Sequence, residues 1–164
     1  MRLIRSGTVI DPTVGLPENS FETGHNAVIL AGSVIGEGAR IGSGTVIERN
    51  VVIGPGCNIQ SNCVISSGAV LGEGVFVGPG TIMLNDKWPH AGSPQTDSSS
   101  PEAPPTLEPV AVGGCATIGG GVVLMPGVRV GMGAMVGAGS LVNMDVLDGW
   151  LYYGRPGYYR HRPL

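Results

Sequence analysis

Aliphatic residues recur at every sixth position along most of this chain. The recurrence runs in two stretches separated by one interruption, and all sixteen positions hold an aliphatic residue or methionine. Six residues along an α-helix turn the chain by about 600°, so such a column would not stay on one helical face. The period therefore predicts short strands separated by corners, with these side chains pointing inward. The sixteen positions are Ile29, Ile35, Ile41, Ile47, Ile53, Ile59, Ile65, Leu71, Val77, Met83, Val112, Ile118, Leu124, Val130, Val136 and Val142.

Two further columns run in phase with the inward aliphatic residues. Two positions before each of them stands a small or β-branched residue, such as Ser33, Thr45 or Cys57. Three positions before, fourteen of sixteen residues are Gly or Asn, which enter the left-handed backbone region at least cost. Such corners would break the long strands of a β-sandwich, the competing all-β arrangement. We therefore predict a parallel β-helix whose triangular coils each consist of three six-residue sides.

One side of the predicted triangular prism differs from the other two. The residue after each inward position is mostly Gly, but every third one departs from this rule: Leu30, Glu48, Ser66, Leu84, Met125 and Asn143. From Met83 to Val112 the step is 29 residues instead of 6, which predicts a 23-residue insertion.

These patterns predict one domain over residues 1–164. Residues 1–24 follow the period poorly and are expected to cap the first coil, as terminal repeats must. Coils are expected at 25–84 and 109–145. A protruding loop near 85–108 and a short C-terminal extension, the tail at 146–164, complete the organisation.

The root of the inserted loop carries the chain's most concentrated polar chemistry. Asn85, Asp86, Lys87, Trp88 and His90 fall within six positions, whereas the middle of the loop is rich in Ser and Pro. A long loop projecting from a solenoid is usually functional, although a tolerated surface insertion remains the alternative.

Composition excludes several classes of function. The net charge is −3 and the pI is about 5.5, which disfavours nucleic acid or an anionic membrane as partner. No run of about 18 apolar residues and no signal-like start is present, so we expect a cytoplasmic protein. Of the three cysteines, Cys57 and Cys63 belong to the small inward column and Cys115 to a corner, so no metal site is expected.

The repeats and four further segments resemble known families. The repeats resemble the hexapeptide motif of left-handed parallel β-helices, and the left hand is implied by that resemblance. Residues 74–80 and 83–89 resemble the G-V-F and N-D-K-Y-P segments of sugar-nucleotide 3-N-acetyltransferases, with Leu84 and Trp88 as departures from Thr and Tyr. Residues 103–107 resemble their A-P-T-L segment. Residues 152–157 resemble the C-terminal signature V-V-G-N-P-A, with Arg155 in place of Asn.

The resemblance implies an acetyl-CoA-dependent N-acetyltransferase in which the amine of a nucleotide-linked 3-amino sugar attacks the thioester directly. It implies a homotrimer with acetyl-CoA bound between subunits. Asn85 would then hydrogen-bond the amine or the tetrahedral centre, with a corner role as the alternative. The remaining candidates are His25 and His90 as general base, Asp86, Lys87 and Trp88 for substrate, and Gly154, Arg155, Pro156 and Arg160 for coenzyme A. Each of these charged groups has simple solvation as its competing interpretation.

Three other functions remain open. The first is acyl transfer to a different small acceptor. The second is a γ-type carbonic anhydrase, which needs three metal-binding histidines, whereas this chain has only His25, His90 and His161. The third is a β-helical scaffold without a substrate. It predicts no coenzyme A binding.

Overall fold

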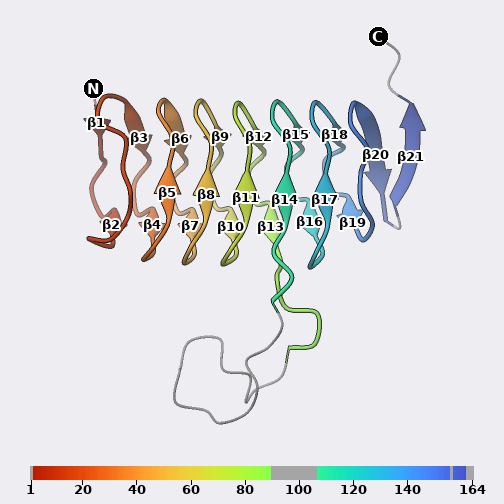
Figure 1. The fold of residues 1–164 in the computed structure, drawn as a ribbon, viewed down its shortest axis with the longest axis horizontal. Helices are drawn as coiled ribbons and strands as arrows, with labels where there is room; N and C mark the ends of the chain where they lie inside the picture. The colour runs from red at the N-terminus through yellow and green to blue at the C-terminus, as the bar shows by residue number, and fades with distance from the viewer. Residues whose placement is uncertain (1, 90–106, 156, 162–164) are drawn as a thin grey trace.

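The protein folds into three parallel sheets wound as a continuous β-helix (Figure 1). The structure, a computed structural model, describes residues 2–89, 107–155 and 157–161. Every regular element in this part of the chain is a strand, most of them two residues long, as the six-residue period predicted. The all-β prediction is thus confirmed, and the fold is the left-handed parallel β-helix that the hexapeptide motif implied. Within the same residues, no helix is long and apolar enough to cross a membrane.

Each sheet forms one side of the prism. Sheet A contains β1 (Arg2–Leu3), β3 (Phe21–Thr23), β6 (Ala39–Ile41), β9 (Asn58–Ile59), β12 (Phe76–Val77), β15 (Thr117–Ile118), β18 (Met135–Val136), β20 (Trp150–Gly154) and β21 (Gly157–His161). Sheet B contains β2 (Val9–Ile10), β4 (Val28–Ile29), β7 (Val46–Ile47), β10 (Val64–Ile65), β13 (Ile82–Met83), β16 (Val123–Leu124) and β19 (Leu141–Val142). Sheet C contains β5 (Val34–Ile35), β8 (Val52–Ile53), β11 (Val70–Leu71), β14 (Ala111–Val112) and β17 (Arg129–Val130).

The strand register confirms the coil length and the insertion. Val64 pairs with Val46 on one side and with Ile82 on the other, so each neighbouring coil is three six-residue sides away in the sequence. Across the interruption, Val70 pairs with Ala111, so this one coil contains the inserted segment in addition to its three sides. The loop leaves the prism between β13 and β14, at the corner that joins sheets B and C (Figure 1).

The inward column forms the core. All sixteen predicted positions are buried, none more than 3% exposed. The corners adopt the predicted backbone: Asn26, Asn50 and Asn62 have φ between 55° and 58°, as does Cys115 at 57° despite its side chain. The fold therefore follows from two requirements that alternate along the chain: an inward apolar residue in each strand and a residue with a left-handed backbone at each corner.

The chain closes the C-terminal end with an antiparallel hairpin. β20 pairs in parallel with β18 and antiparallel with β21. Tyr152 is fully buried beneath the last coil, and its hydroxyl donates to the carbonyl of Leu141 at 2.8 Å. The hairpin thereby covers the end of the core.

Candidate functional site

The corner between sheets B and C is the irregular edge of the prism. Six of the seven residues that break the glycine rule each follow a strand of sheet B, so they line this one corner from coil to coil. The seventh, Gln60, follows β9 of sheet A. The inserted loop starts here, and its base is closed by a hydrogen bond from the Glu108 backbone N–H to the Asn85 carbonyl at 2.8 Å. The residues at the loop root are therefore held on the rigid prism.

Asn85 is the most enclosed polar residue at the loop root. Its side chain is 9% exposed, and Nδ2 donates to the carbonyl of Ser67 at 3.1 Å. Ser67 lies one coil earlier, directly beneath Asn85 in the stack. Because a carbonyl accepts and cannot donate, this contact fixes which end of the amide is nitrogen. Asn85 is thus oriented and not a left-handed corner residue.

Glu48 extends this contact one coil further. One of its carboxylate oxygens, Oε2, accepts from both the backbone N–H of Ser67 at 2.9 Å and the Ser67 hydroxyl at 3.0 Å. Glu48, Ser67 and Asn85 thereby form one hydrogen-bonded chain across three coils. Sequence reasoning noticed Glu48 as an exception at this corner but assigned it no role, because its partner belongs to the next coil and meets it only through stacking.

A pocket of about 160 Å³ opens beside this chain of hydrogen bonds. Its walls combine an apolar side with one carboxylate, one guanidinium and one amide. The lining residues are Leu30, Val46, Leu107, Glu48, Arg49, Ser67 and Asn85. A small apolar cavity with a few convergent polar groups is typical of a ligand site.

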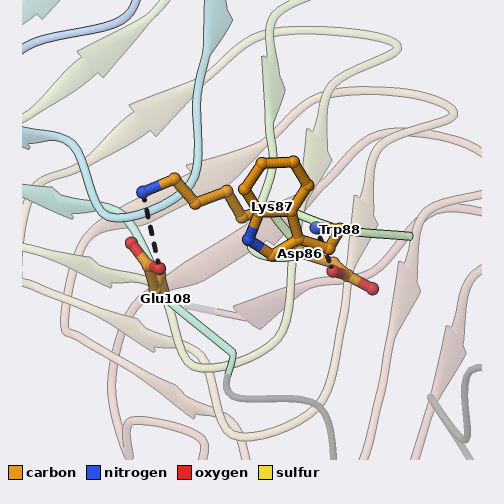
Figure 2. Close-up of polar contacts among 4 residues, drawn as sticks. All are labelled: Asp86, Lys87, Trp88 and Glu108. Carbon is orange, nitrogen blue, oxygen red and sulfur yellow. Dashed lines mark hydrogen bonds and ion pairs between the residues drawn. The ribbon is translucent and has the colours of Figure 1, made fainter.

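Asp86, Lys87 and Trp88 do not line this pocket. Figure 2 shows their side chains together with that of Glu108. Asp86 Oδ1 accepts from the Trp88 backbone N–H at 2.9 Å, which tightens the turn. The Lys87 ammonium lies 3.8 Å from the Glu108 carboxylate, and this pair ties the two ends of the loop together. The Trp88 side chain is 81% exposed. Asn85 therefore lines the pocket, whereas the three residues that follow it in the sequence do not.

The two histidines that the structure describes, His25 and His161, lie away from this pocket. His25 stands at the corner between sheets A and B, three strands of sheet B away from Asn85, and its Nδ1 is 2.9 Å from the Ser6 hydroxyl. His90 lies outside the described residues. His161 belongs to β21 in the C-terminal hairpin. Among the residues that the structure describes, no group of three His, Cys, Asp or Glu side chains could hold a metal ion.

The residues expected to bind coenzyme A lie at the C-terminal end. The Gly154 N–H donates to the Ser140 hydroxyl at 3.1 Å. The Arg155 guanidinium is exposed and donates through Nε to the carbonyl of Gly139 and through Nη2 to that of Gly121 at 3.4 Å. These carbonyls belong to stacked corners between sheets A and B. Arg160 is placed in β21 opposite Leu151, and Pro156 lies outside the described part of the chain.

Comparison with known proteins agrees with this fold. Residues 50–85 match the family described as bacterial transferase hexapeptide (six repeats). No curated protein sequence matches the chain significantly.

Solved structures extend the likeness to nearly the whole chain. A presumed acetyltransferase from Bacillus cereus has a TM-score of 0.68 and 22% identity, over 96% of this chain and 78% of that one. A hexapeptide transferase family protein from Anaplasma phagocytophilum has a TM-score of 0.62 and 25% identity, over 98% and 84% of the two chains. A variant of AntD, an N-acyltransferase from Bacillus cereus in complex with dTDP and coenzyme A, has a TM-score of 0.55 and 18% identity, over 99% and 83%. The protein is therefore a left-handed parallel β-helix, and its residues 50–85 match the bacterial transferase hexapeptide repeats.

Proposed function

We propose that this protein is an acetyl-CoA-dependent N-acetyltransferase whose acceptor is an amino sugar, specifically a nucleotide-linked 3-amino sugar. The observation that carries the proposal is the oriented, nearly buried amide of Asn85 beside a pocket at the root of the inserted loop. The N-D-K segment that resembles sugar-nucleotide 3-N-acetyltransferases begins at this residue. The solved AntD complex, which holds dTDP and coenzyme A, supports the same pairing of ligands on this fold.

Acetyl transfer from a thioester to an amine needs few catalytic groups, because the thioester is already activated and a neutral amine is a good nucleophile. The neutral amine attacks the thioester carbonyl, the C–N bond forms, the C–S bond breaks, and coenzyme A leaves as a thiolate. The amine nitrogen gives up one proton to a base, and the thiolate takes one up. Alignment of the two reactants can contribute about 7–11 kcal/mol, and each preorganised donor to the oxyanion about 3 kcal/mol. Asn85 contributes to the alignment, because its side-chain oxygen can accept from the amine, and His25 or His90 is the base.

The sugar nucleotide and coenzyme A both carry phosphate groups, so their binding sites need positively charged side chains. Arg49, which is exposed at the pocket, is placed to meet the phosphates of the sugar nucleotide. Asp86, Lys87 and Trp88 would bind the sugar and the nucleobase of the sugar nucleotide from the loop root. Gly154, Arg155, Pro156 and Arg160 would hold coenzyme A, with the Arg155 guanidinium fixed at an exposed corner by two carbonyls.

We propose that the site is completed by a homotrimer. His25 lies on a different corner from Asn85 and three coils away, so the two residues do not meet within one chain. Outward valines on sheet C are also strongly exposed: Val34 is 49%, Val52 40% and Val70 46% exposed. A neighbouring copy would cover such an apolar ladder.

The test compares wild type with Asn85→Ala. We expect the rate of acetyl transfer to a dTDP- or UDP-linked 3-amino sugar, measured as the release of free coenzyme A thiol, to fall about 10²-fold because the amine is no longer aligned. Asn58→Ala, a change on the outer face of sheet A, is the matched control and should retain activity. Unchanged turnover in Asn85→Ala would remove this residue from the mechanism.

A second measurement separates an enzyme from a scaffold. Saturating acetyl-CoA should raise the melting temperature of the wild-type protein, because a ligand that binds only the folded form stabilises it. No shift with acetyl-CoA, together with no thiol release from any amino sugar, would favour the scaffold.

A further inference from the structure

We infer that Glu48 recognises the acceptor amine, in partnership with the side-chain oxygen of Asn85. The inference rests on the proposed acetyl transfer and assigns the preference for an amine over a hydroxyl to these two side chains. It assigns a substrate-binding role to a residue that lies outside the N-D-K segment.

Glu48 offers the pocket an acceptor with remaining capacity. Its Oε2 is occupied by two donors, both from Ser67, whereas no residue of the described chain donates to Oε1. The side chain is half-buried beside the apolar groups of Leu30, Val46 and Leu107. A carboxylate removed from water in this way is costly unless a cation or donor approaches it.

Asn85 offers a second acceptor to the same pocket. Its Nδ2 is directed to the Ser67 carbonyl, so the amide plane turns Oδ1 the other way. No donor to this oxygen is found among the described residues. Ser67 therefore does two things at once: it holds the Glu48 carboxylate from one side and the Asn85 amide from the other.

A ligand complementary to this pair must bring more than one donor. A hydroxyl group has a single O–H, which can satisfy only one of the two oxygens. An amine has two N–H donors and an ammonium three, and the ammonium also neutralises the carboxylate. The two oxygens thus favour the amine both by donor count and by charge.

The test is a binding comparison made without acetyl-CoA. Calorimetric titration would measure a dTDP-linked 3-amino sugar and its 3-hydroxy counterpart against wild type, Glu48→Gln and Glu73→Gln. Gln at position 48 keeps one oxygen for both Ser67 donors, removes the charge and replaces the acceptor Oε1 with an NH2 donor. Glu73, an exposed residue at another corner, provides the matched change of charge.

We expect wild type and Glu73→Gln to bind the amino sugar at least about 10-fold more tightly than the hydroxy sugar. Glu48→Gln should weaken amino-sugar binding about 10- to 100-fold and leave hydroxy-sugar binding within about 2-fold of wild type. The wild-type preference is measured without any variant, so it tests the inference even if Glu48→Gln unfolds. Equal binding of the two sugars, or of neither, would overturn it. Amine discrimination without acetyl transfer would instead count against the proposed function alone.

Discussion

At the scale of single residues, the small inward residues form hydrogen bonds with the backbone as well as packing in the core. Ser33, Thr45 and Cys57 each donate from their side chain to a backbone carbonyl 15 residues later, at 2.8, 2.7 and 3.0 Å. The hydroxyls of Ser33 and Thr45 also accept a backbone N–H from the next coil. These side chains are small enough for the crowded interior and can bridge two coils, which explains why Ser, Thr and Cys recur beside the larger inward residues.

The same environment makes two cysteines unreactive. Burial raises the pKa of the Cys57 and Cys63 thiols, so at pH 8 both stay protonated in the folded protein, whereas Cys115 is exposed. We expect iodoacetamide at pH 8 to label one cysteine per chain, Cys115, as measured by intact-protein and peptide mass spectrometry. Cys57 and Cys63 should react only after unfolding in urea. Cys115→Ser should abolish the fast label, and equal labelling of all three thiols would contradict this account.

At the scale of single elements, one corner shows two different reasons for glycine. Gly54 and Gly56 flank Pro55 between β8 and β9. A Cβ on Gly54 would lie 2.6 Å from the carbonyl carbon of Gly72 in the next coil, so this position is set by close stacking. Gly56 has φ of 65° and nothing within 4 Å of a built Cβ, so its requirement is purely one of backbone conformation.

The two reasons predict different costs. Gly56→Ala should cost about 1–2 kcal/mol for its left-handed backbone, a fall in melting temperature of roughly 2–8 °C. Gly54→Ala should lower the melting temperature clearly more, because the stacked coils must move apart against their ladder of hydrogen bonds. Differential scanning calorimetry of both variants measures the contrast. A larger loss at Gly56 would show that conformation, and not stacking, limits the corner.

At the scale of the whole molecule, the sides of the prism carry different outer surfaces. Near the N-terminal end, sheet A presents Arg2, Glu22 and Arg40, all exposed. Sheet C presents valines at the equivalent outward positions. Sheet B is apolar along its length, with Val9 59% and Ile82 36% exposed. The two apolar sides meet at the corner that carries Asn85, so association of copies and formation of the site concern the same region.

A matched pair of variants tests this asymmetry. Val52→Asp places a charge on the outer face of sheet C, and Asn58→Asp places the same charge on sheet A, in the next strand along the chain. We expect sedimentation velocity to show a trimer for wild type and Asn58→Asp, and a shift toward monomer for Val52→Asp. A stable wild-type monomer would contradict the trimer, and equal behaviour of the two variants would contradict the assignment of faces.

Much of this architecture could be predicted from the sequence because the fold repeats locally. An inward residue such as Ile47 and a corner residue such as Asn50 can each be recognised from the few residues around them. The interruption after Met83 locates the inserted loop. The site is only partly readable in this way. Asn85 could be singled out because it stands outside the corner column, but its orientation depends on Ser67 in the coil beneath. Likewise, the carbonyls that hold Arg155 belong to two different coils, and the sequence does not show which backbone groups remain open to a side chain.

The insertion between β13 and β14 leaves the register of the neighbouring strands unchanged on all three sides, since Val70, Val77 and Met83 each still meet the equivalent residue of the next coil. The hydrogen bond from the Glu108 backbone N–H to the Asn85 carbonyl joins the two ends of the inserted segment. The register of the coils on either side therefore does not depend on how long the segment between them is. A segment of another length or composition can therefore replace it between β13 and β14, while the stacked coils keep the same register.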